Sequence, residues 1–209
     1  MRSAVPPDPA DLSLNEVATL AAKAARGAGL TWGAAEDTSR SAAWLARHLG
    51  AWADQLLALL ENPPPADQSP LLLAGPLADG ALTEAAPMAA PMAAPIWVAP
   101  LFLLGPGHCS PVALRLGIAE IHANPGEIPS ASLSACALAS LPPGDVSLRR
   151  SPTRLPPLAH PLPVRFRRSS VSLAALARLE ALAALTYVPA SDFSRRRGAG
   201  AGLLDDEDE

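Results

Sequence analysis

Proline constrains this chain more than any other residue type. There are 24 prolines among 209 residues, against about ten expected from average composition. Much of the excess lies in three stretches: the triple proline Pro63–Pro65, the tandem Ala-Ala-Pro repeat of residues 85–96, and Ser151–Pro163. Because proline ends helices and cannot donate to a strand ladder, these stretches predict loops within an otherwise compact chain.

The remaining composition excludes two classes of protein. Hydrophobic residues make up 49% of the chain, whereas a fully disordered chain needs low hydrophobicity and high net charge. The 14 glycines show no three-residue period, which excludes collagen. The formal net charge of −4 is concentrated in Asp205–Glu209, five acidic residues in a row. We therefore expect residues 203–209 to form an acidic disordered tail.

The N-terminal part predicts a helical unit over residues 12–60, after a flexible arm at residues 1–11. Ser13-Leu14-Asn15-Glu16 fits a capping box, in which side chain and backbone bond reciprocally at a helix start. The first helix continues to Gly27 and Gly29, which are typical helix-ending residues. It carries a polar face made of Glu16, Thr19, Lys23 and Arg26. Two further helices are expected at about 34–48 and 52–60.

The middle, residues 61–170, predicts strands joined by Pro-rich loops. Short apolar or alternating runs bounded by turn residues are typical of strands. The runs are Leu71–Leu73, Ile96–Leu104, Val112–Ile121, Val146–Arg149 and Val164–Arg167. Three copies of a four-residue unit in residues 85–96 each contain proline, so we expect an extended loop there.

The C-terminal part, residues 171–202, predicts a core helix followed by a Gly-rich segment. Leucine recurs every third residue from Leu173 to Leu185, and only Arg178 and Glu180 are charged. On a helix of 3.6 residues per turn these leucines wrap most of the way round, which is typical of a buried helix. The fold class is therefore α+β: a single domain over 12–202 with an N-terminal helical unit, a small mainly antiparallel sheet and a buried C-terminal helix.

A turn between the first two helices is one half of the candidate site. Its candidate binding residues are Arg26, Gly27, Gly29, Trp32 and Glu36. Glycines near a helix start let an anion approach exposed backbone amides. The glycines follow a helix rather than a strand, so the dinucleotide-binding fingerprint is not met. The alternative is an ordinary helix–helix turn in which Glu36 pairs with Arg26 or Lys23.

The segment Tyr187–Gly202 is the other half of the candidate site. Its candidates are Tyr187, Ser191, Ser194, Arg195, Gly198, Gly200 and Gly202. These residues could surround a small anionic ligand with a nest of glycine amides. The alternative is that the glycines only let the segment pack tightly against a neighbour.

Other kinds of site are not predicted. The histidines and cysteines that could bind a metal, His108, Cys109, His122 and Cys136, lack the paired short spacing of zinc ligands. A Cys–His nucleophile would need a spatial arrangement that sequence does not show. The acid-free, Arg-rich stretch from Arg149 to Arg178 has Phe166 as its one aromatic residue, so we interpret it as a solvent-facing surface rather than a nucleic-acid interface.

The sequence also favours a cytoplasmic location. The two cysteines make no disulfide framework, and no basic and apolar signal pattern opens the chain. The longest unbroken apolar run, Ile96–Leu104, contains Pro100 and is far shorter than the ~20 residues that a membrane helix needs. We expect neither a membrane nor a cofactor as partner.

Both glycine motifs resemble a known family. Leu12–Glu16, Lys23–Leu30 and Trp32–Glu36 resemble the opening of the uncharacterised bacterial domain-of-unknown-function family 3726. Thr186–Ser191, Ser194-Arg195 and Gly198–Gly202, with Asp205 or Asp206, look like the family's C-terminal signature. The family has no assigned activity, so the resemblance transfers no catalytic residue. It implies that both ends of the chain belong to one unit.

These observations lead to one functional expectation and two alternatives. We expect a small-ligand-binding or accessory protein whose site joins the Arg26–Glu36 turn to Tyr187–Gly202 and takes a small anionic molecule. The first alternative is an enzyme of unassigned reaction in which Tyr187 or Ser191 acts with Arg195 and Glu36; the lack of a legible catalytic dyad weighs against it. The second is an interaction protein that buries its Ala/Leu faces in a homo-oligomer.

Overall fold

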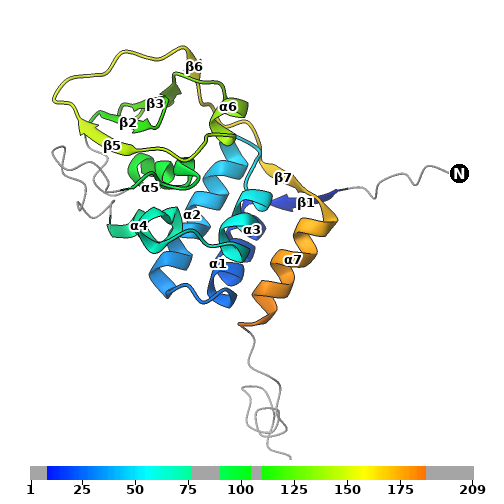
Figure 1. The fold of residues 1–209 in the computed structure, drawn as a ribbon. Helices are drawn as coiled ribbons and strands as arrows, with labels where there is room; N and C mark the ends of the chain where they lie inside the picture. Colours follow the sequence, from blue (N-terminus) through cyan, green and yellow to red (C-terminus); the bar gives the residue numbers. More distant parts are fainter. Residues whose placement is uncertain (1–8, 77–89, 105–109, 187–209) are drawn as a thin grey trace, which may run out of the picture.

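The computed structural model describes residues 9–76, 90–104 and 110–186 (Figure 1). Helices and antiparallel strands are mixed in these ranges, which confirms the predicted α+β class. The helices are α1 (Leu14–Gly27), α2 (Trp32–His48), α3 (Ala53–Glu61), α4 (Pro70–Pro76), α5 (Ala99–Leu104), α6 (Ala135–Ala139) and α7 (Leu173–Ala184). The strands are β1 (Ala10–Ser13), β2 (Val112–Leu116), β3 (Ala119–Ala123), β4 (Ser130–Ala131), β5 (Val146–Arg150), β6 (His160–Pro161) and β7 (Arg168–Val171).

The strands form two antiparallel sheets. One has the order β5-β2-β3-β4-β6 and lies at the opposite end of the molecule from the free end of α7 (Figure 1). The other pairs β1 with β7, in the register Ala10↔Val171 to Ser13↔Arg168. The expected flexible arm therefore ends earlier than predicted, because Ala10 and Asp11 are held by this pairing. The pairing also ties the start of the chain to the residues that lead into α7.

The predicted N-terminal helices are present, and α1 and α2 begin at residues whose side chains cap the helix. The capping box is confirmed: Glu16 Oε2 accepts from the Ser13 amide at 2.7 Å, and Ser13 Oγ accepts from the Glu16 amide at 3.3 Å. At the start of α2, Thr31 Oγ1 accepts from the Ala34 amide. Because Thr31 is the cap, α2 begins at Trp32, two residues before the predicted start. Trp32 is thus fixed on the first turn of α2.

Three predicted strands are wrong. Leu71–Leu73 lies in helix α4, and Ile96–Leu104 forms a 3-10 turn, Pro95–Val98, followed by α5. Short continuous apolar runs fit a buried helix as well as a buried strand, so periodicity does not separate the two. Val164–Arg167 is irregular instead, because the amides of Arg165 and Phe166 donate to the carbonyl of Arg47.

The end of the tandem repeat is part of the fold rather than a linker. Residues 85–89 lie outside the described ranges, but Met92 is fully buried. Its amide and carbonyl exchange hydrogen bonds of 2.9 and 3.0 Å with Gly144. The extended loop predicted for residues 85–96 is therefore wrong for its end: Met92, which closes the second unit, and Ile96, which closes the third, are buried in the core.

Helix α7 is not the central core helix that its leucines predict. Its fully buried residues are Ala175, Leu179 and Ala183, and its main packing partners are α1 and α3 rather than a sheet. Leu173 is 44% exposed, and Leu185, just after the helix, is 70% exposed. Figure 1 shows α7 at the edge of the molecule. Apart from Arg178 and Glu180, the helix is thus apolar all round but covered on one side.

A single cluster of buried side chains links these elements, from Val17 of α1 to Leu179 of α7. Trp44, Trp52 and Trp97 are buried in it. Among the helices of the described ranges, none has the length and apolar character to cross a bilayer.

Candidate functional site

The turn between α1 and α2 is a Schellman motif built on Gly29. The Leu30 amide donates to the Ala25 carbonyl and the Gly29 amide to the Arg26 carbonyl, both at 3.0 Å. Gly29 has φ 94°, a left-handed conformation that costs other residues energy. This geometry supports the alternative in which Gly29 serves an ordinary helix–helix turn.

Gly27 also has a packing role. A Cβ atom at this position would lie 1.8 Å from the carbonyl oxygen of Leu182 in α7. Helices α1 and α7 therefore meet backbone to backbone at Gly27, and the end of α7 is held beside the turn. The glycine positions the walls of the site rather than offering an amide to a ligand.

A cavity of about 570 Å³ opens at this junction, and we call it the turn cavity. Its lining combines residues of α1, of the first turns of α2 and of the end of α7. These residues are Ala22, Lys23, Arg26, Trp32, Ala35, Glu36, Leu185 and Thr186. The structure thus brings three of the predicted residues, Arg26, Trp32 and Glu36, to one cavity.

Arg26 and Trp32 form a pair at the turn. The guanidinium carbon of Arg26 lies 4.5 Å from the centre of the Trp32 ring, within cation–π range. Arg26 Nη1 also donates to the Leu30 carbonyl. Trp32 is nevertheless 72% exposed, whereas the other three tryptophans are buried. The turn therefore holds an aromatic ring in solvent beside a fixed positive charge.

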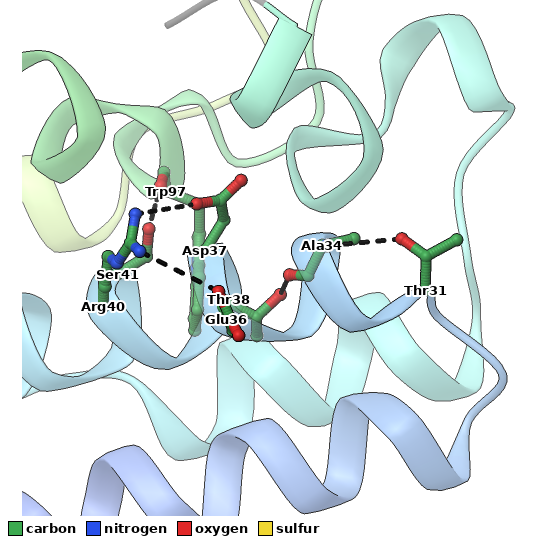
Figure 2. Close-up of polar contacts among 8 residues, drawn as sticks. All are labelled: Thr31, Ala34, Glu36, Asp37, Thr38, Arg40, Ser41 and Trp97. Atoms are coloured by element: carbon green, nitrogen blue, oxygen red, sulfur yellow. Dashed lines mark hydrogen bonds and ion pairs between the residues drawn. The ribbon is translucent and has the colours of Figure 1, made fainter. Parts of the chain in front are cut away.

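Glu36 does not make the predicted pair with Arg26 or Lys23. Its carboxylate lies 3.9 Å from Arg40 Nη2, one turn further along α2. Figure 2 shows Arg40 reaching toward both Glu36 and Asp37, whose Oδ1 lies 3.3 Å from Arg40 Nη1. An i,i+4 partner on the same helix is nearer than a cation across the turn, and sequence spacing alone does not rank the two. Of the residues that line the turn cavity, Glu36 thus shares Arg40 with Asp37.

The second predicted motif lies outside the described residues. Tyr187, Ser191, Ser194, Arg195, Gly198, Gly200 and Gly202 all fall there. Leu185 and Thr186, which directly precede Tyr187, line the turn cavity. The chain therefore enters this motif from the wall of the cavity.

Lys23 is the main lining residue that lies outside the predicted set. It belongs to the polar face of α1 and lines both the turn cavity and a neighbouring cavity of about 480 Å³ between α1 and α7. The neighbouring cavity is lined by Leu12, Asn15, Glu16, Thr19, Leu20, Lys23, Leu176, Glu180 and Ala183. The spacing of the polar face is the signal that could have found Lys23, because these side chains share one side of a helix.

Other chemistry-bearing groups are engaged elsewhere in the fold. His122 lies 3.0 Å from Glu120 and 2.8 Å from the Pro156 carbonyl. Cys136 is an exposed free thiol, while His108 and Cys109 lie outside the described residues. Within the described ranges no group of three or more His, Cys, Asp or Glu side chains could hold a metal.

Several residues of the Arg-rich stretch form ion pairs. Arg154 makes two hydrogen bonds, of 2.7 and 3.0 Å, to the Glu127 carboxylate, and Asn124 donates to the same group. Arg168 pairs with Asp11 and Arg178 with Glu61. These contacts join distant segments of the chain. Hydrogen bonds from Arg154 and Asn124 hold the pKa of Glu127 below its usual value.

A comparison with known protein families finds a match in the N-terminal part of the chain. The family model described as "Protein of unknown function (DUF3726)" matches residues 12–71. This range contains α1, the turn and α2, and the match confirms the resemblance of the N-terminal motifs, Leu12–Glu16, Lys23–Leu30 and Trp32–Glu36. No curated protein and no solved structure matches the chain.

Proposed function

We propose that the turn cavity binds a small anionic molecule with a flat apolar part. Residues 12–71, which include the turn, match the model of a family of proteins of unknown function, so the proposal is argued from the site itself. The observation that carries the proposal is Trp32, which is 72% exposed beside a guanidinium at the mouth of a cavity. An indole exposed beside a cation can take the flat face of a ligand ring against its own free face.

Charge supports the anionic part. Lys23 and Arg26 lie on adjacent turns of α1 and line the same cavity. The carboxylate of Glu36, which lines the same cavity, is directed to Arg40 at 3.9 Å. Charge-assisted hydrogen bonds to a carboxylate or phosphate are stronger than neutral ones.

Shape supports the apolar part. The volume of about 570 Å³ lies within the range of small-molecule sites, about 300–1,000 Å³. Ala22, Ala35 and Leu185 supply apolar walls, and the exposed indole of Trp32 supplies a surface on which a flat ring can stack. We include Tyr187–Gly202 in the proposed site because the chain leaves the cavity wall at Thr186. The proposed setting is the cytoplasm, since an exposed free thiol such as Cys136 suits a reducing compartment.

Tryptophan fluorescence tests the proposal. Acetate, benzoate and inorganic phosphate are titrated into the full-length protein, and the signal of Trp32 is taken as the difference from Trp32→Phe. Benzoate is expected to change this signal at lower concentration than acetate, because it can stack as well as pair. Lys23→Gln should weaken benzoate binding by about tenfold, since a hydrogen bond to a charged group contributes about 1.5–3 kcal/mol.

Arg115→Gln is the matched control, because Arg115 is an exposed strand residue of β2 outside the lining of the turn cavity. It should leave binding unchanged. Equal benzoate affinity in Lys23→Gln and Arg115→Gln would contradict the proposed site, as would a lack of response to all three anions.

A further inference from the structure

The neighbouring cavity between α1 and α7, which we call the α1–α7 cavity, adjoins the turn cavity. Its volume is about 480 Å³, and Lys23 lines both cavities. On α7, Ala183 lines the α1–α7 cavity, and Leu185 lines the turn cavity. The two cavities therefore follow one another along the same pair of helices and meet at Lys23. A ligand bound in the turn cavity has room to extend past Lys23 into the α1–α7 cavity.

The charged side chains differ between the two cavities. The turn cavity is lined by two cations, Lys23 and Arg26, and by one carboxylate, Glu36. The lining of the α1–α7 cavity has two carboxylates, Glu16 and Glu180, and Lys23 is its one cation. Because opposite charges attract, an anionic group of a ligand is favoured at the turn, and a cationic group is favoured beyond Lys23.

Glu180 is the carboxylate that is available to such a cation. The Glu16 carboxylate already accepts a hydrogen bond of 2.7 Å from the Ser13 amide. Glu180 is exposed, and no hydrogen bond or ion pair joins it to another residue of the described ranges. The other charged residue of α7, Arg178, is paired with Glu61 instead. A protonated amine in the α1–α7 cavity would therefore meet a carboxylate without a competing partner.

The spacing of these groups sets the length of the ligand. Glu180 and Leu185 are five residues apart, which is about 7.5 Å along a helix, so a ligand that reaches both cavities needs charges about 8–10 Å apart. An extended peptide advances by about 3.3–3.6 Å per residue, so three residues cover this distance. Asn15 and Thr19 in the same lining can bond peptide N–H and C=O groups.

We infer that the ligand is a short peptide of about three residues with an aromatic residue at its carboxyl end. This inference rests on the proposed function of the turn cavity and extends the site into the α1–α7 cavity. The terminal carboxylate lies at Lys23 and Arg26, and the aromatic ring lies against Trp32. The terminal ammonium lies at Glu180. Benzoate, which has no amine, occupies the turn cavity alone.

Paired peptides test the inference in the full-length protein at low salt, with the Trp32 signal again taken as the difference from Trp32→Phe. Gly-Gly-Phe carries the free amine, and N-acetyl-Gly-Gly-Phe lacks its charge. The wild type should bind Gly-Gly-Phe about fivefold more tightly, which is the upper end for an exposed ion pair. L-phenylalanine should not bind more tightly than N-acetyl-L-phenylalanine, because the ammonium of a single residue lies too close to the carboxylate to reach Glu180.

Glu180→Gln tests the place of the amine. This variant should bind Gly-Gly-Phe only as tightly as it binds N-acetyl-Gly-Gly-Phe. The loss should be confined to the peptide with the free amine, which also separates it from a failure to fold. Asp67→Asn is the matched control, because Asp67 is an exposed carboxylate outside the linings of both cavities; it should keep the preference for Gly-Gly-Phe.

The outcomes separate this inference from the proposed function. If benzoate binds the wild type more tightly than Lys23→Gln, but the wild type binds the free and the acetylated peptide equally, the inference is overturned and the proposed function stands. If neither benzoate nor the peptides bind, both fail together. A preference for Gly-Gly-Phe that persists unchanged in Glu180→Gln would also overturn the inference, because the amine would then lie elsewhere.

Discussion

Replacement of Gly27 by alanine tests how α1 and α7 are held together. Gly27 is the last residue of α1, and its missing side chain lets α7 approach the helix backbone. The added Cβ would lie 1.8 Å from the Leu182 carbonyl oxygen and 2.7 Å from the carbonyl carbon. Both atoms belong to the backbone, so no side-chain rotation can relieve the contact.

The magnitude follows from two opposing effects. Carbon contacts are favourable near 3.5–4.0 Å, so the helices would have to separate by about 1.5 Å or more. Overpacking of this kind costs about 1–3 kcal/mol. Alanine in place of glycine within a helix stabilises the folded state by at most about 1 kcal/mol. The expected net loss of stability is therefore about 1–2 kcal/mol.

Urea unfolding monitored by circular dichroism and tryptophan fluorescence measures this loss. A shift of the midpoint with an unchanged m value gives the free-energy difference directly. Gly33→Ala is the matched control, because Gly33 lies in the first turn of α2 and no other part of the fold lies within 4 Å of where the Cβ atom of the alanine would be. This control should be neutral or stabilising by up to about 1 kcal/mol.

The two variants should therefore change stability in opposite directions. If Gly27→Ala proves as stable as Gly33→Ala, the close contact between α1 and α7 is refuted. The position of Leu185 and Thr186 in the wall of the turn cavity would then lose its basis.

Three further predictions concern the turn, a buried histidine and a loop. Gly29→Ala should lose about 1 kcal/mol in urea unfolding, because φ 94° is unfavourable for alanine; equal stability with the wild type would contradict the turn geometry. Burial lowers the pKa of His48, so the neutral form is favoured on folding: stability should be complete above about pH 6.5 and decline as the pH falls, and the variant His48→Asn should lack this part of the decline. Asn124→Ala should cost about 1–3 kcal/mol, because Asn124 bonds both the amide and the carbonyl of buried Leu155; unchanged hydrogen exchange at the Leu155 amide would contradict this role.

In this fold, local features such as helix caps follow from the sequence more reliably than which faces of a helix are covered by other elements. Ser13 and Glu16 form the expected capping box because both partners lie within one helical turn. Helix α7 departs from its prediction for the opposite reason: leucines all round a helix indicate burial, but packing against α1 and α3 covers one side. Whether the other side is covered depends on partners that are remote in sequence or belong to another copy.

The dependence on partners remote in sequence also explains why two predicted strands are helical and why β1 was not predicted. Leu71–Leu73 and Ile96–Leu104 are apolar runs without a period, and tertiary packing makes them helical. β1 escapes prediction because its four residues become a strand through pairing with β7, more than 150 positions away.

For the site, the sequence places Arg26, Trp32 and Glu36 in one turn, and the structure brings them to one cavity. Their partners could not be predicted equally well. Trp32 stacks on Arg26, whereas Glu36 bonds along its own helix to Arg40. The spacing of the polar face of α1 places Lys23 beside Arg26, but it does not reveal that the end of α7 supplies the facing wall of the cavity.

Fluorescence quenching by iodide tests the central claim, an anion site at Trp32, most directly, because iodide is itself an anion and three of the four tryptophans are buried. Acrylamide, which is neutral, serves as the reference for simple accessibility. We predict that iodide quenches Trp32 more efficiently in the wild type than in Lys23→Gln, that acrylamide quenches both equally, and that benzoate protects the wild type from iodide. Equal iodide quenching in the two proteins, with no protection by benzoate, would contradict the account.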